Sequence, residues 1–161
     1  MNVSSLQEVK QELQELPPKQ LLELCLSLAK YKKDNKEYLA YLLFQSHDRE
    51  GFIAEIKKET DKHFSEIQAL TNLYPIRKGL RTTLRIINKY CKYMGDKAVT
   101  AELLIFFCRK VKQTKIPIHK SARLQNLFNT QVKRIRSAVS FLHEDLQADF
   151  LRELEEIVKT P

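Results

Sequence analysis

The sequence is poor in residues that interrupt helices. It contains three glycines, five prolines and no tryptophan among 161 residues. β-Sandwiches and barrels need many turn residues, so this scarcity argues against them and favours helices. A chain of this length is large enough to bury a core and suits one domain. We therefore expect a single all-helical domain over residues 1–161.

The sequence also lacks the common motifs of catalytic and metal sites. It has no G-x-G-x-x-G, no P-loop and no G-x-S-x-G, and its four histidines have no metal-ligand spacing. Cys25, Cys91 and Cys108 are far apart at apolar helix positions, so we expect them in the core. These absences predict no enzyme, no cofactor and no metal. The odd cysteine count and the polar N-terminus indicate a cytoplasmic location.

Long apolar runs are absent as well. The run from Leu103 to Cys108 has six residues, whereas a helix that crosses a bilayer needs about 20. Wound as a helix, this run points in every direction, so it must be covered by other helices on most sides. We predict that residues 98–111 form the central helix of the fold, surrounded by amphipathic helices whose apolar sides face it.

Capping residues and helix breakers divide the chain into seven or eight helices. The predicted caps are Ser5, Asn35, Asp48, Gly95, Asp96 and Ser121. Tyr74 and Pro75 are predicted to separate the helix at 49–73 from the helix at 76–94. Short connections make consecutive helices antiparallel, and pairs recur at roughly 40 residues. This spacing favours a HEAT/ARM-like α-solenoid, a right-handed superhelix, over a closed helical bundle.

One N-terminal segment resembles a known group of proteins. It reads LPPKQLLEL from Leu16 to Leu24 and is followed by KEYL at residues 36–39. This segment is similar to the N-terminal hairpin of certain small, uncharacterised all-helical bacterial proteins, and the match covers about a quarter of the chain. The resemblance implies an all-α fold. It carries no functional residue over to this sequence.

Positive charge is concentrated in the middle of the chain. Residues 75–142 hold 16 basic and two acidic side chains, whereas the segments before and after them are net acidic. The predicted helix at 76–94 places six cations within an arc of about 120°, opposite its apolar side. We call these six the basic stripe: Arg77, Lys78, Arg81, Arg85, Lys89 and Lys92. The helix that begins at Ala122 adds three further candidate binding residues: Arg123, Lys133 and Arg134.

The basic stripe is unfavourable for the helix that carries it. Like charges four residues apart repel by about 0.2–0.5 kcal/mol per pair, and no acidic residue in this helix relieves them. Three explanations remain open at this point. The charge is solvated or pairs with acidic segments of the same fold, it binds nucleic acid, or it binds an acidic protein.

These patterns predict a non-enzymatic helical scaffold that binds an acidic partner protein through its basic residues. The alternative is a DNA- or RNA-binding protein that uses the same residues. It would contact the phosphate backbone without reading sequence, because few aromatic side chains lie nearby for stacking. No membrane binding is expected, since the basic helices need their apolar faces for the core. The sequence leaves the oligomeric state open.

Overall fold

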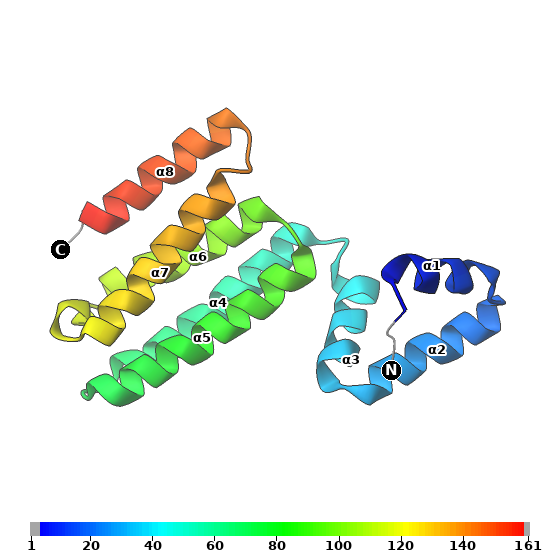
Figure 1. The fold of residues 1–161 in the computed structure, drawn as a ribbon. Coiled ribbons are helices and arrows are strands. Elements are labelled where there is room, and N and C mark those ends of the chain that lie inside the picture. The colour runs from blue at the N-terminus through cyan, green and yellow to red at the C-terminus, as the bar shows by residue number, and fades with distance from the viewer. Residues whose placement is uncertain (1–3, 160–161) are drawn as a thin grey trace. The chain divides into compact units, whose positions relative to one another are not determined.

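The computed structural model describes residues 4–159, which form eight α-helices and no strand (Figure 1). The helices are α1 (Leu6–Glu15), α2 (Pro18–Tyr31), α3 (Lys33–Ala40), α4 (Arg49–Gln68), α5 (Leu73–Met94), α6 (Lys97–Gln113), α7 (Ala122–Val139) and α8 (Glu144–Lys159). A π-helical turn at Tyr41–Gln45 follows α3, and a 3-10 turn at Ile118–Lys120 precedes α7. The all-α prediction is confirmed. We expected one domain over residues 1–161, whereas the contacts divide the chain into two compact units, Met1–His47 and Asp48–Pro161.

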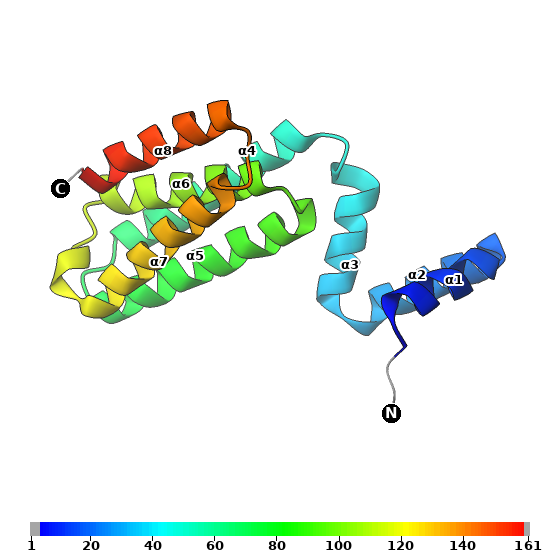
Figure 2. The ribbon, with the colours of Figure 1, turned by 45° about the horizontal axis from the view of Figure 1, so that its top comes forward.

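The larger unit, Asp48–Pro161, is built around α6. This helix packs against α4, α5, α7 and α8, and Figure 2 shows it between α8 on one side and α5 on the other. Five of its side chains are 0% exposed: Ala101, Leu103, Leu104, Phe107 and Cys108. The prediction that residues 98–111 form the central helix is therefore confirmed within this unit.

The preferred solenoid is not confirmed. In a solenoid, each helical repeat contacts only its neighbours along the chain. Here α6 contacts both of the helices that precede it in the larger unit and both of the helices that follow it. Stacked helical hairpins and a closed bundle share these contacts, so the contacts do not distinguish the two. These helices enclose a common core, because the apolar surface of α6 extends around its whole circumference.

Most helix ends lie where the sequence predicts them. Side-chain hydrogen bonds cap the N-termini at Ser5, Asp48, Asp96 and Ser121, and Gly95 ends α5 with a φ of 63°. Two boundary predictions are wrong. Asn35 lies inside α3, where its amide donates to the Leu28 carbonyl oxygen at 2.9 Å. Pro75 lies in the first turn of α5, where its missing N–H needs no partner in the helix.

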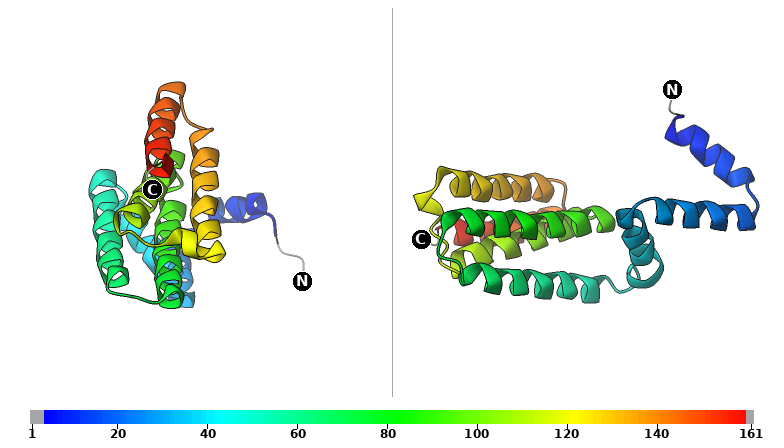
Figure 3. Two further views of the ribbon diagram at one scale, coloured as in Figure 1. Left: turned by 90° about the vertical axis from the view of Figure 1, so that its left-hand side faces the viewer. Right: turned by 90° about the horizontal axis from the view of Figure 1, so that it is seen from below.

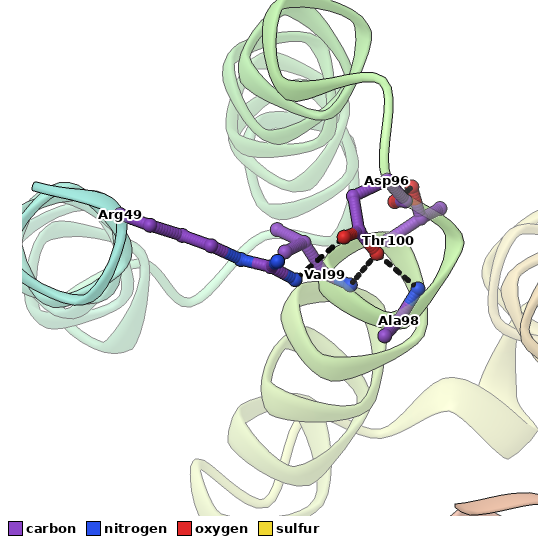
Figure 4. A network of polar contacts seen from close by, with 5 residues as sticks. All are labelled: Arg49, Asp96, Ala98, Val99 and Thr100. Atoms are coloured by element: carbon purple, nitrogen blue, oxygen red, sulfur yellow. Dashed lines mark hydrogen bonds and ion pairs between the residues drawn. The ribbon is translucent and has the colours of Figure 1, made fainter. Parts of the chain in front are cut away.

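Asp96 fixes the start of the central helix (Figure 4). Its carboxylate accepts hydrogen bonds from the backbone N–H groups of Ala98 at 2.7 Å and Val99 at 3.2 Å. Its carbonyl oxygen accepts a hydrogen bond from the Thr100 hydroxyl at 2.8 Å. The carboxylate also forms an ion pair with Arg49 at 2.6 Å. Asp96 therefore both caps α6 and joins it to α4.

We expect Asp96→Ala to lower the free energy of unfolding by about 1–2 kcal/mol, because the first N–H groups of α6 lose their acceptor. Asp96→Asn keeps a capping oxygen and loses only the ion pair with Arg49. The Arg49 side chain is 53% exposed, so this loss should stay below about 1 kcal/mol. Chemical denaturation followed by circular dichroism measures both variants. Equal losses would show that the ion pair, and not the cap, dominates.

Candidate functional site

The basic stripe lies on the solvent side of α5. Lys78, Arg81, Arg85 and Lys92 are exposed, whereas Arg77 and Lys89 are half-buried. The opposite side of the helix is buried in the core: Ile76, Leu80, Thr83, Leu84, Ile87 and Cys91. The helix thus divides into an apolar half that holds it in the fold and a cationic half that faces outward.

Two observations place α7 beside α5 with the same direction. Near their N-termini, Arg77 of α5 and Arg123 of α7 line one pocket of about 440 Å³. Further along, burial raises the pKa of the Cys91 thiol of α5, and Arg134 of α7 lies near enough for its charge to oppose that rise. Figure 2 and the right-hand view of Figure 3 show the two helices running alongside each other. The cations of both helices therefore lie on neighbouring elements.

The adjoining edges of the two helices carry five of the nine candidate residues. At 100° per residue, Arg123 and Arg134 fall within about 20° of each other on α7, at the edge toward α5. The corresponding edge of α5 carries the stripe members Arg77, Arg81 and Lys92. Lys133 lies about 100° away from Arg134 and does not share this edge. We call the stripe together with Arg123, Lys133 and Arg134 the basic face.

The acidic side chains near the basic block pair with other cations. Glu102 of α6 forms an ion pair with Lys57 of α4 at 2.6 Å, and Lys110 of α6 pairs with Asp61 of α4 at 2.6 Å. The acidic helix α8 contributes Glu153, which pairs with Arg109 of α6. These contacts and the pair between Asp96 and Arg49 neutralise two cations of α4, Arg49 and Lys57, and two of α6, Arg109 and Lys110.

Most of the basic face has no internal counter-charge. Within residues 4–159, no acidic side chain forms an ion pair with Arg77, Lys78, Arg81, Arg85, Lys92, Arg123, Lys133 or Arg134. Internal pairing therefore accounts for Arg109 and Lys110 of α6 but not for these eight. Their charge is available to a ligand.

The pocket at one end of the face collects several features that attract anions. It is lined by Leu73, Tyr74, Arg77, Ser121, Ala122 and Arg123. The first residues of both α5 and α7 are among them, and helix N-termini carry partial positive charge. The Arg77 guanidinium lies 5.6 Å from the ring centre of Tyr74, a side chain that is 70% exposed. Sequence reasoning missed Tyr74, because its place before Pro75 suggested only a helix break.

Comparison with protein-family models, curated proteins and solved structures found no match. The resemblance of the N-terminal hairpin to small bacterial helical proteins therefore stays a prediction. Among the described residues, no helix is long and apolar enough to cross a membrane.

Other reactive side chains form no comparable cluster. In the part of the chain that the structure describes, no group of three or more His, Cys, Asp or Glu side chains is arranged to hold a metal ion. Cys91 and Cys108 are buried as expected, and burial raises the pKa of both thiols, that of Cys108 to about 12. Cys25 is exposed, which corrects its predicted place in the core. The basic face is thus the strongest candidate site in the larger unit.

Proposed function

We propose that the chain is a non-enzymatic helical interaction module of the cytoplasm that binds the phosphate backbone of a nucleic acid through the basic face. One observation carries this proposal. Eight cations on two parallel helices have no acidic partner among the described residues, although Arg109 and Lys110 of α6 each pair with an acidic side chain. From Arg77 to Lys92 the stripe spans 15 residues, or about 22 Å of helix.

The composition of the face favours nucleic acid over a protein partner. Protein interfaces usually have an apolar core with aromatic anchors, and charged residues are depleted there. On the outward side of α5, the only large apolar side chain that is strongly exposed among the described residues is Tyr74, at one end. Protein–nucleic acid interfaces are instead polar and strongly positive. Arg77, Arg123 and the two helix N-termini also line one pocket, and this concentration of positive charge suits a phosphate group.

An acidic segment of another protein is the second candidate. The spacing of Arg77, Arg81, Arg85 and Lys89, one residue per helical turn, supports it. A partner helix with carboxylates at the same spacing would place one acid near each cation. Arginine binds carboxylate and phosphate with similar two-pronged geometry, so the chemistry of single contacts does not separate the candidates.

Fluorescence anisotropy with three labelled probes tests the proposal. The probes are a random-sequence DNA duplex, a random-sequence RNA strand and a poly-glutamate peptide of similar net charge. Each is titrated with the full chain at about 50 and about 200 mM salt. If six or more phosphates are contacted, affinity for the duplex should fall by about a thousandfold or more between these concentrations, because counterions are released on binding.

The probes separate the outcomes. Micromolar binding of DNA or RNA that is independent of sequence and steeply salt-dependent supports the proposal. If the chain binds the peptide at least tenfold more tightly than it binds either nucleic acid, the ligand of the basic face is an acidic protein segment, the second candidate. No binding of any probe at low salt rejects both.

A further inference from the structure

The smaller unit exposes most of its apolar side chains. Among residues 4–47, Tyr41 alone is buried. Eleven large apolar side chains of this unit are exposed: Leu6, Val9, Leu22, Leu24, Leu26, Leu28, Tyr31, Tyr38, Leu42, Leu43 and Phe44. Some of these side chains line two hollows of the unit, and an exposed apolar patch usually marks an interaction site.

A unit of this size cannot bury enough apolar surface alone. Chains below about 40 residues usually need disulfides, metals or oligomerisation to fold stably, and this unit is only slightly longer. It has one cysteine, Cys25, and no cluster of metal-ligating side chains among its described residues. Of the three ways to stabilise a small unit, only oligomerisation is compatible with these described residues.

The charges of the smaller unit are balanced and segregated. Residues 1–47 hold six basic and six acidic side chains, so this unit has no net attraction for a polyanion. α1 carries Glu8, Glu12 and Glu15 against Lys10 alone, whereas the turn between α2 and α3 carries Lys30, Lys32, Lys33 and Lys36 against Asp34 and Glu37. Glu12, Glu15, Lys30 and Lys36 form no ion pair with another described residue. Two copies of such a surface are complementary to each other.

A hollow on the α2–α3 hairpin has the shape and chemistry to receive an amphipathic helix. Its volume is about 620 Å³, and its lining includes the apolar side chains of Leu26, Leu43 and Phe44 and those of three lysines, Lys30, Lys33 and Lys36. α1 offers the complementary pattern. It contributes no buried residue, its apolar side chains lie on one side, and its net charge is negative.

We propose that the smaller unit is a homodimerisation module, in which α1 of one copy packs on the lysine-lined hollow of the other. Two-fold symmetry forms this contact twice, with each acidic helix opposite the partner's lysines. The apolar side chains supply the buried surface, and the charges set the orientation. The inference is independent of the ligand of the basic face.

Charge reversal in the full chain tests the proposal. Glu12→Lys with Glu15→Lys makes both complementary surfaces basic, and Lys30→Glu with Lys36→Glu makes both acidic. Sedimentation equilibrium should give the unaltered chain a mass of about twice 18.9 kDa. Each double variant alone should dimerise at least tenfold more weakly, because α1 and the hollow that receives it then carry net charge of the same sign. An equimolar mixture of the two should recover the dimer as a heterodimer.

The mixture is the decisive measurement, because misfolded variants would not complement each other. The control is Lys58→Glu with Lys62→Glu on α4. It reverses the charge of two exposed lysines of the larger unit and should leave the mass unchanged. A chain that is monomeric at all concentrations would overturn the proposal, since the apolar surface is then covered in some other way. A dimer that both reversals leave intact, or a mixture that stays monomeric, would overturn it too.

Discussion

Phe107→Ala should lower the free energy of unfolding of the larger unit by about 3–5 kcal/mol. Phe107 is 0% exposed on the central helix, and its ring packs edge-on against Phe64 of α4, with centroids 5.5 Å apart. Removing the ring leaves a cavity between α4 and α6 that neighbouring helices cannot fill without moving. A domain is typically stable by only about 5–15 kcal/mol, so the loss is a large fraction of the total. Denaturant titration followed by circular dichroism measures it.

Phe106→Ala is the matched control, since it removes the same side chain one position earlier. Phe106 is half-buried, and its ring lies near the ammonium groups of Lys57 at 5.6 Å and Lys110 at 5.2 Å. Each exposed cation–π contact stabilises by about 0.5–1 kcal/mol, so we expect a total loss of about 1–2 kcal/mol. Equal losses from the two variants would contradict the central position of α6.

The central helix could be predicted because its evidence is local. Six consecutive apolar residues leave a helix without a polar side. Residues 103–108 must therefore be covered by other helices on most sides, in any arrangement of the fold. Caps such as Asp48 and Asp96 could be predicted for the same reason, since their hydrogen bonds lie within one turn. Asn35 fits that pattern too, but its amide bonds to Leu28 in the preceding helix, a contact that sequence spacing does not reveal.

The arrangement of the helices could not be predicted, because it depends on which faces meet. A period of roughly 40 residues is shared by solenoids and by bundles of helical hairpins. The sequence placed cations on the outside of α5, but the parallel α7 that brings Arg123 to Arg77 became visible only in the structure. The division at residue 48 was hidden as well. The leucines of α2 have core-like spacing, yet the structure leaves Leu22 and Leu28 exposed.

Arg81→Glu combined with Arg85→Glu should reduce nucleic-acid binding by at least about a hundredfold at low salt. Two charges about 4 Å apart in water interact by about 1 kcal/mol, so each reversal replaces attraction with repulsion and changes one contact by about 2 kcal/mol. The dependence of log affinity on log salt should become shallower by about one for each lost phosphate contact. Anisotropy titrations over a salt series measure both quantities.

The control for this variant is Lys58→Glu with Lys62→Glu on α4, which makes the same change in net charge outside the basic face. It should lose only the small part of the affinity that depends on net charge. Equal losses in the two variants would mean that the chain attracts nucleic acid by its overall charge of +8 and that the basic face has no special role.

The same Arg81 and Arg85 reversals should preserve or raise the stability of α5. Each of the two introduced glutamates would lie four residues from a remaining cation, Arg77 or Lys89, so two repulsive pairs become attractive at about 0.2–0.5 kcal/mol each. Binding would then fall while the melting temperature holds or rises, which separates a ligand-binding surface from a structural one. A variant that loses binding and stability together would mean that the stripe serves the fold. The unpaired cations would then need an explanation within the protein itself.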